Sequence, residues 1–302
     1  MSAGEVVAIT ATSQRQGVVF LDAQGQEVYA GPNLDLRAVF EGGAIDDRMG
    51  DRVYETTGHT PSFLLAPAKM HWFRANRPHA YDRIASVITL ADWLAFRLSG
   101  ELLSEPSLAA EAGLLDVRGR RWCTELLNDL DTPGNSHIPL VIGGSVAGQL
   151  NEKTSRETGL PVGTPVAVSG ADTQSALLGM GLVREHQMGI VAGWSVPLQM
   201  VLGSPAFSPQ RQTWTGCHVV DGMWVLESSS GDAGNSYRWL TDTILGGGEQ
   251  AFADMDALAR AVPAGSEGAT AFLGPSRMNM ASLGIRRGGF LFPVPLTFSE
   301  TA

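Results

Sequence analysis

The sequence predicts an α/β fold, and two observations support that prediction. The chain has 302 residues, and its 36 glycines sit at apparent turns between short apolar runs. Frequent junctions of this kind are typical of strands that alternate with helices. In addition, residues 163–180 read as a turn, a buried strand and then a helix. The length suffices for two domains or one large one, and we place a boundary near residues 165–185.

The N-terminal part predicts strands first and helices later. Residues 6–10 form a short β-branched run, and residues 17–22 and 27–30 flank the turn Ala-Gln-Gly-Gln as in a hairpin. From residue 61 to residue 100 the apolar spacing predicts helices, one of which includes Ile88 through Leu98 and stops at Gly100. Two loop-rich stretches follow, at residues 104–116 and 133–148.

Asp172 occupies a position where ligands often bind. It follows the predicted strand and precedes a helix that begins at Thr173. In open α/β sheets, ligands bind at the carboxyl ends of the strands. An aspartate there can also be a helix N-cap. The two roles are compatible, because a capping geometry also orients the carboxylate.

The C-terminal part predicts further strands and two helices. Residues 189–202 read as two short strands around Gly193-Trp194-Ser195, and a hairpin brackets Asp-Gly between residues 217–220 and 224–227. Helices are expected over residues 236–245 and 251–262.

Composition and missing motifs exclude several classes of protein. The net charge is −10 with no basic cluster, so we expect neither nucleic acid nor a membrane as a partner. We read no signal peptide and no membrane span, and Cys123 and Cys217 have no CxxC spacing, so we expect a cytoplasmic protein. The P-loop, GxGxxG, GxSxG and HExxH motifs do not occur, which argues against proteases and zinc enzymes.

Four segments in order carry a family resemblance. They are AITATSQRQG at 8–17, NLDLR at 33–37, DWL through SEPS and GLLD over 92–116, and GLP through GAD to the glycines at 179 and 181. From about residue 5 to residue 240, this series resembles the FGGY family of carbohydrate kinases. Within the family, it is most similar to the pentulose kinases such as xylulokinase and to the autoinducer-2 kinase type.

The resemblance implies a two-domain actin/RNase H-like (ribonuclease H-like) fold with sugar and Mg-ATP in the cleft between the domains. It assigns residues 1–170 to the N-terminal, sugar-binding domain and residues 171–302 to the start of the C-terminal, nucleotide-binding domain. The family's opening DxGT phosphate loop and its late glycine-rich adenosine site have no match, so we expect a fold incomplete at both termini. Such a chain would expose strand edges and apolar surface, and we expect poor solubility or dependence on a partner.

The resemblance also implies a reaction and a site. ATP, with Mg²⁺, would phosphorylate the hydroxyl of a pentulose-like or related sugar, and Asp172 would take the hydroxyl proton as general base. Gln14, Arg15 and Gln16 would bind sugar hydroxyls. Without the resemblance, these three residues would read as a solvated polar turn.

Asp35 and the loop at residues 193–195 have more than one interpretation. Asp35 lies two residues from Arg37, so the two could form a structural ion pair or shape the sugar pocket. Gly193, Trp194 and Ser195 correspond to the family's second phosphate loop and would contact the nucleotide. Trp194 stands where the family has a hydroxyl residue, so packing on the sugar or within the core is the alternative to phosphate contact for this side chain.

Two other functional readings remain open. The chain could be a catalytically incomplete sugar-binding or regulatory homologue, or a structural protein of the same superfold that uses the cleft for protein contacts. The motifs argue against the structural reading. The expected partner is a small-molecule sugar, and a homodimer is one assembly that the sequence leaves open.

Overall fold

The structure is a computed structural model that describes residues 2–133, 135–193, 195–229, 233–272 and 289–292. The chain divides into two compact units. The first comprises Met1–Gly189 with Gln199–Glu227, and the second comprises Ile190–Leu198 with Ser228–Ala302. The boundary expected between residues 170 and 171 stays a prediction.

A three-stranded antiparallel sheet forms the centre of the first unit, in the order β3-β2-β4. Its strands are β2 (Val18–Leu21), β3 (Glu27–Gly31) and β4 (Ser86–Thr89). The β2–β3 pair confirms the predicted hairpin. Every residue of β2 is buried because the strand alternates between two cores, one containing Val18 and Phe20 and the other Val19 and Leu21.

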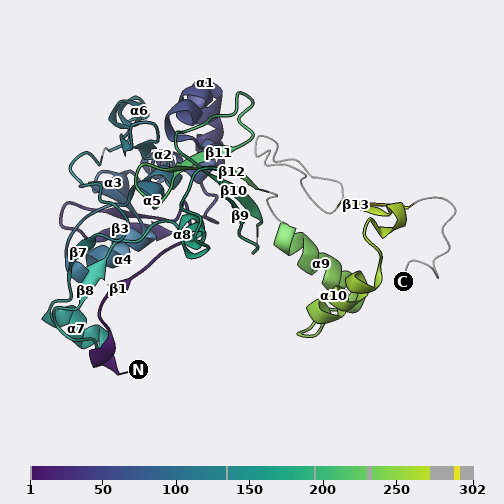
Figure 1. Cartoon of the computed structure of the whole chain (residues 1–302). Helices are drawn as coiled ribbons and strands as arrows, with labels where there is room; N and C mark the ends of the chain where they lie inside the picture. The colour runs from purple at the N-terminus through teal and green to yellow at the C-terminus, as the bar shows by residue number, and fades with distance from the viewer. Residues whose placement is uncertain (1, 134, 194, 230–232, 273–288, 293–302) are drawn as a thin grey trace. The chain divides into compact units, whose positions relative to one another are not determined.

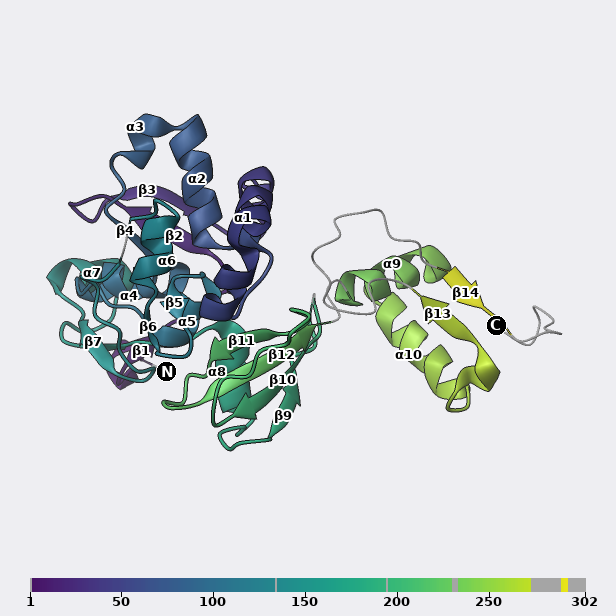
Figure 2. The ribbon, with the colours of Figure 1, turned by 90° about the horizontal axis from the view of Figure 1, so that it is seen from above.

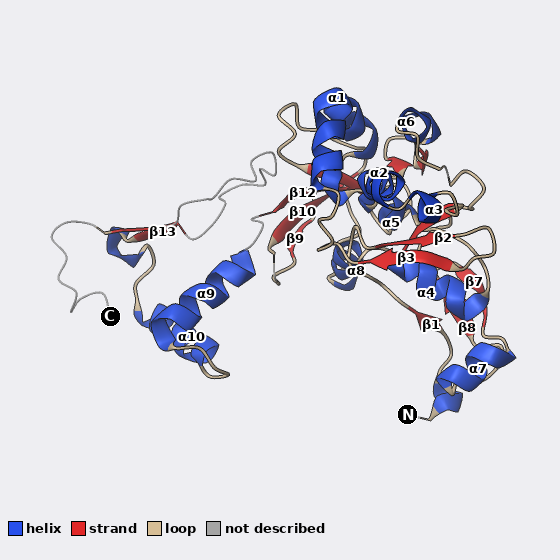
Figure 3. Cartoon of the chain, turned by 180° about the vertical axis from the view of Figure 1, so that it is seen from behind, coloured by secondary structure: helices blue, strands red, loops and turns tan. Residues whose placement is uncertain are grey.

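Helices cover both faces of this sheet. Helices α1 (Val39–Thr57) and α2 (Ala66–Asn76) contribute to the core around Phe20, while α4 (Leu90–Ser99) packs on the opposite face (Figures 1 and 3). The short elements η2 (Ser62–Leu64) and α3 (Pro78–Tyr81) flank α2. The sandwich of helix, sheet and helix is the α/β layering that the sequence predicts.

Strand β4 corrects the predicted helix at Ile88. Residues 86–89 pair with β2, and α4 begins only at Leu90. Thr89 is the N-cap, with its hydroxyl accepting from the amide of Asp92, and Gly100 ends the helix at φ 85°. Ile88 is apolar whether it belongs to a buried strand or to a helix, so periodicity alone does not separate the two.

A second sheet joins distant parts of the chain in the order β1-β8-β7. Strand β1 (Ile9–Thr10) runs parallel to β8 (Pro165–Ala167), and β7 (Val146–Gln149) is antiparallel to β8. The predicted strand at residues 6–10 is therefore formed only over its last two residues. Helix α7 (Glu152–Thr158) precedes β8, and α8 (Asp172–Gly179) follows it, which confirms the predicted strand-to-helix junction.

The stretch at 104–116 was expected to be a loop, but it contains helix α5 (Pro106–Glu111). Pro106 opens this helix, and the side chain of Glu105 caps it by accepting from the amides of Ser107 and Leu108. The helix has only six residues, too few for a periodic signal. Three short elements follow it: β5 (Leu115–Asp116), β6 (Arg121–Trp122) and α6 (Thr124–Asp129).

The remaining strands confirm the two strands expected around residues 193–195 and the pairing of a hairpin, but the first strand of that hairpin covers residues 214–217 rather than 217–220. A four-stranded sheet has the order β11-β12-β10-β9, with β9 (Met188–Ile190), β10 (Pro197–Leu202), β11 (Trp214–Cys217) and β12 (Trp224–Ser229). In the second unit, α9 (Ala233–Leu245) packs on α10 (Ala251–Ala261), and β13 (Thr270–Phe272) pairs with β14 (Gly289–Leu291) (Figure 2). The 3₁₀ turns η1 (Ala3–Glu5) and η3 (Ser266–Gly268) complete the elements. Across the described residues, none of the helices combines the length and apolarity that crossing a membrane requires.

Candidate active site

The candidate site lies where β1 and β8 end side by side. The parallel pairing of these strands continues into a bridge between Ser13 and Ala171. The amide of Asp172 donates to the carbonyl oxygen of Ser13 at 3.1 Å, and the hydroxyl of Thr12 donates to the carbonyl oxygen of Gly170 at 2.7 Å. These bonds bring the polar loop after β1 next to Asp172.

Gly170 lets the side chains of Val219 and Ser107 pack directly against the backbone next to Asp172. A Cβ atom at Gly170 would lie 2.0 Å from the side chain of Val219 and 2.7 Å from the hydroxyl oxygen of Ser107. The same hydroxyl accepts from the amide of Ala171 at 3.0 Å and donates to the carboxylate of Glu105. Helix α5 therefore supports the backbone that carries Asp172, and only glycine fits at position 170.

Asp172 is the first residue of α8, and Ala171 is its N-cap. The prediction that Asp172 is the N-cap is thus wrong, because the helix begins one residue earlier than expected. The carboxylate still accepts a hydrogen bond from the next amide, that of Thr173, at 2.8 Å. The Asp172 side chain is solvent-exposed on one side and crowded by protein on the other. Partial burial raises its pKa above the ordinary value, against the opposing charge of Arg15. An exposed carboxylate with a raised pKa is suited to accept a proton.

Arg15 is held by two carboxylates. Its guanidinium donates to Glu227 from Nη1 at 2.5 Å and from Nη2 at 3.0 Å, and Nη1 lies 3.5 Å from Glu111. The ring of Trp214 lies below the guanidinium, 5.4 Å from its central carbon. Burial alone would lower the pKa of Arg15, but the charges of Glu227 and Glu111 outweigh it and raise the pKa. The arginine is therefore permanently charged and fully paired.

Glu111, at the end of α5, gathers residues from three segments. Its carboxylate accepts from the amide nitrogens of Gln16 at 2.9 Å and Gln174 at 2.8 Å, and it lies 3.3 Å from Nε2 of His59. Gln16 adopts φ 58°, a left-handed conformation that is unusual for glutamine and concentrates at functional sites. Burial would raise the pKa of Glu111, but the charges of Arg15 and His59 lower it. A single buried carboxylate thus fixes the polar loop against α8.

Gln14 contacts the segment between β3 and α1, which contains Asp35. The side-chain oxygen of Gln14 accepts from the amide of Asn33 at 3.2 Å. Asp35 pairs with Arg37 at 2.7 Å and accepts from the hydroxyl of Tyr29. Asp35 and Arg37 lie between β3 and α1 rather than on a strand, as the argument for their pairing assumed, yet the ion pair forms. A role for Asp35 in shaping a sugar pocket stays a prediction.

Gly193 and Ser195 belong to the second unit, and Trp194 lies outside the described residues. The amide of Gly193 donates to the carbonyl oxygen of Ser195 at 3.0 Å. A Cβ at Gly193 would meet nothing closer than 3.9 Å, so the backbone is open on that side. Within the described ranges, no three His, Cys, Asp or Glu side chains are grouped as metal ligands. Contact with Mg-ATP at this turn stays a prediction.

Sequence reasoning missed the acidic and amide partners of the loop. They are His59, Glu111, Gln174, Gln199 and Glu227. Gln174 carries a weak signal, since it lies two residues after Asp172 on the same helix. Glu111 and Glu227 are isolated acids in apolar surroundings, and buried acids are rarely unpaired. That rule could have marked them as paired, but it could not have named Arg15 as the partner.

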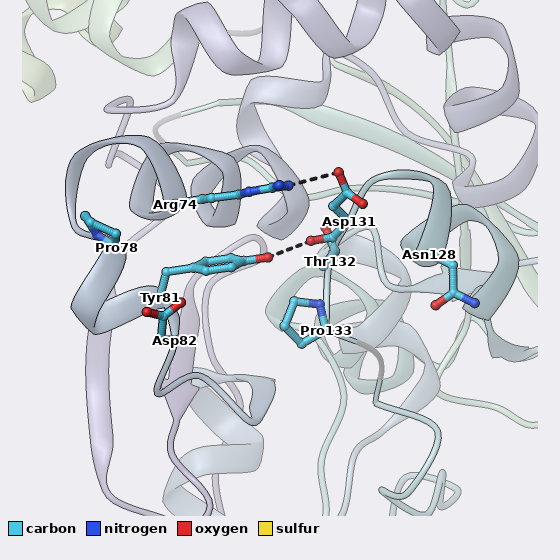
Figure 4. Close-up of a pocket in the computed structure, with 8 residues that line it drawn as sticks. All are labelled: Arg74, Pro78, Tyr81, Asp82, Asn128, Asp131, Thr132 and Pro133. Carbon is cyan, nitrogen blue, oxygen red and sulfur yellow. Dashed lines mark hydrogen bonds and ion pairs between the residues drawn. The ribbon is translucent and has the colours of Figure 1, made fainter.

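A separate pocket of about 600 Å³ opens between α3 and the turn that follows α6 (Figure 4). Arg74 pairs with Asp131 at 2.9 Å across it, and the hydroxyl of Tyr81 donates to the carbonyl oxygen of Asp131 at 2.6 Å. None of the predicted site residues lines it. The side chains of its ion pair, Arg74 and Asp131, are both exposed, so the β1–β8 junction remains the better candidate for chemistry.

Comparisons with known proteins agree with this architecture. The model of the FGGY family of carbohydrate kinases, N-terminal domain, matches residues 1–179. An autoinducer-2 kinase of Salmonella paratyphi A is 32% identical over 275 residues, which cover 87% of this chain and 52% of that protein. The crystal structure of xylulose kinase from Rhodospirillum rubrum superposes with a TM-score of 0.83 at 23% identity, over 98% of this chain and 60% of the other. A glycerol kinase from Plasmodium falciparum, solved with ADP, gives a TM-score of 0.79 at 19% identity, over 96% and 58% of the two chains.

The structural likenesses define the class of protein first: this is an actin/RNase H-like α/β protein with the fold of sugar and glycerol kinases, as expected from the sequence. The family match and the curated relative then identify it further. The chain belongs to the FGGY family of carbohydrate kinases. It spans about half the length of the curated relatives that it matches.

Proposed function

We propose that this protein takes part in the ATP-dependent phosphorylation of a sugar hydroxyl, with Asp172 as the general base. The hydroxyl oxygen attacks the γ-phosphorus of ATP, its proton passes to a carboxylate oxygen of Asp172, and ADP leaves with the electrons of the broken bond. Mg²⁺, when bound, neutralises charge on the phosphates. The acceptor would be a pentulose or a related small carbohydrate, because the relatives include autoinducer-2 and xylulose kinases.

The observation that carries this proposal is the hydrogen bond between the amide of Asp172 and the carbonyl of Ser13. It holds an exposed carboxylate beside a loop of side chains that can bind hydroxyls. Gln14 is half-buried, and its amide nitrogen has no protein partner in the hydrogen bonds of the described residues. It is therefore the member of the loop best placed to donate to a sugar.

One observation favours the alternative, a sugar-binding or regulatory homologue without catalysis. Arg15 and Gln16 are already engaged with Glu227 and Glu111. A loop fixed in this way can recognise a sugar without any contribution to phosphoryl transfer. The two functions differ in turnover and agree in binding, so both quantities need to be measured.

The first prediction concerns turnover. ADP release from Mg-ATP should depend on a sugar from a panel of pentuloses, hexoses and polyols. Asp172→Asn should reduce that rate by about 10²- to 10⁴-fold, the usual contribution of a general base. Sugar affinity, measured by calorimetry, should change much less, because the amide keeps the shape of the side chain.

Asp131→Asn is the matched control, since it makes the same acid-to-amide change at the distant Arg74 pair. It should leave turnover unchanged. Sugar binding without turnover in the wild-type protein would establish the alternative, and wild-type rates in Asp172→Asn would exclude Asp172 as the base.

A further inference from the structure

The pairing of Arg15 bears on which sugars the site accepts, an inference that rests on the proposed function. Arg15 is the one cation among the predicted sugar-binding residues. Its side chain is 12% exposed, and the carboxylates of Glu227 and Glu111 occupy its guanidinium. A carboxylate on a ligand would have to displace an internal one to reach it.

The other nearby cations are covered as well. Arg37 pairs with Asp35 and lies over the rings of Tyr29 and Trp72. Lys69 is fully buried, and its ammonium donates to the carbonyl oxygens of Gln16 at 3.3 Å and Leu64 at 3.0 Å. Neither of these two side chains offers a free charge to a ligand at the loop.

Asp172 therefore presents the accessible charge of the site, and that charge is negative. Even with His59 protonated, Arg15 and His59 together supply two positive charges against the three carboxylates of Glu111, Glu227 and Asp172. A ligand carboxylate bound beside the loop would be repelled by Asp172 without a compensating ion pair. A neutral polyol or ketose meets no such penalty.

We propose that Glu227 and Glu111 are specificity-determining residues that neutralise Arg15 and so restrict the site to uncharged sugars, excluding sugar acids. Glu227 has the larger share in this selection, because it holds both terminal nitrogens of the guanidinium. The site would discriminate against sugar acids because the carboxylates of the protein already pair with Arg15. Binding sites can gain specificity by leaving the charge of an unwanted ligand without a counter-ion.

Glu227→Gln is the direct test. The change keeps the size of the side chain and removes one negative charge from Arg15. The new amide can still accept from the guanidinium, and the side-chain oxygen of Gln199, which has no hydrogen-bond partner, can accept from its nitrogen once that amide turns. The variant therefore keeps a partner for Gln199, and it loses one of the two hydrogen bonds that Glu227 accepts from Arg15.

Binding is measured by calorimetry with two matched pairs of probes, ribitol against ribonate and glucitol against gluconate, and with xylulose. Wild-type protein should bind at least one neutral compound and discriminate against the acids. In Glu227→Gln, affinity for the acids should rise by about tenfold or more, as expected for one charge-assisted hydrogen bond. Affinity for neutral compounds should change by less. Asp131→Asn, which frees the distant Arg74, should alter neither.

The outcomes separate this inference from the proposed function. Wild-type protein that binds an acid as tightly as its neutral counterpart overturns the inference, even if Glu227→Gln does not fold, and leaves the kinase proposal standing. Unchanged discrimination in a folded Glu227→Gln overturns it too. Neutral sugars that bind more tightly than the matching acids, without sugar-dependent ADP release, overturn the kinase proposal and support the inference. Binding of no compound overturns both.

Discussion

At the scale of single residues, Asp172 differs from its acidic neighbours in both exposure and partners. Glu111 and Glu227 are buried and take several hydrogen bonds from cationic or amide groups. Asp172 is exposed, accepts one amide from Thr173, and has its pKa raised by partial burial. The site thus separates carboxylates that hold structure from the one that is free to take a proton.

This separation predicts how Asp172 affects stability. Because its pKa is raised on folding, the charged form is disfavoured in the native state, and the stability it contributes is lost as the pH rises through its folded pKa. Asp172→Asn should therefore unfold at the same or a higher urea concentration than wild type at pH 7. At a pH low enough to protonate the acid in both states, the two proteins should coincide. A lower midpoint for the variant at pH 7 would show that the ionised carboxylate stabilises the fold.

At the scale of elements, α1 and η2 approach each other more closely than side chains allow. A Cβ atom at Gly42 of α1 would lie 2.3 Å from the backbone nitrogen and Cα of Phe63 in η2. The adjacent Gly43, in the same helix, has no atom within 4 Å of the corresponding point. One glycine is therefore required for packing, and its neighbour is not.

Gly42→Ala and Gly43→Ala should accordingly have opposite effects. The first forces α1 away from η2 and should lower the free energy of unfolding by about 1–3 kcal/mol, the usual cost of overpacking. The second should raise it by about 0.5–1 kcal/mol through reduced backbone entropy in the unfolded chain. Urea titration of both variants measures the difference. Equal effects would mean that the contact between α1 and η2 relaxes freely.

The elements also show what the sequence could predict. The hairpin β2–β3 and the step from β8 to α8 depend on local turns and apolar runs, and both were predictable. Strand β4 and helix α5 were not, because Ile88 suits either structure and α5 is a six-residue helix. Among site residues, Asp172 and Gln14 to Gln16 came from motifs. Glu111 and Glu227 act through partners far away in the chain, and local pattern carries no information about such pairs.

At the scale of the whole molecule, two further buried acids, Asp92 and Glu105, lie in the first unit. Asp92 accepts from the hydroxyl of Ser104, and Glu105 caps α5. Burial raises the pKa of Asp92 to about 7 and that of Glu105 to about 8. Their ordinary values are 3.8 and 4.5, so folding favours their protonated forms.

Stability should therefore fall as the pH rises through neutrality. The contribution of these acids is fully present below their unfolded pKa values and is lost as the pH passes about 7 and about 8. Glu111, whose pKa is lowered, acts in the opposite direction and loses its contribution as the pH falls below the ordinary value for glutamate. Urea midpoints should be higher near pH 5.5 than near pH 8.5. Glu105→Gln should flatten that slope, and the exposed Glu101→Gln should not. If Glu105→Gln leaves the pH dependence of the urea midpoint unchanged, that dependence arises from other groups.

The bond between Thr12 and Gly170 joins positions 158 residues apart, so the junction of β1 and β8 exists only after a long segment of chain has closed. Closure of this kind is entropically unfavourable and slow compared with the formation of helices and hairpins. A compound that binds at the junction recognises the closed chain alone, and it must stabilise that state in proportion to its saturation. Under the proposed function, a sugar that binds there would stabilise the folded chain as well as serve as a substrate, and protection from unfolding would identify it without any assay of phosphate transfer.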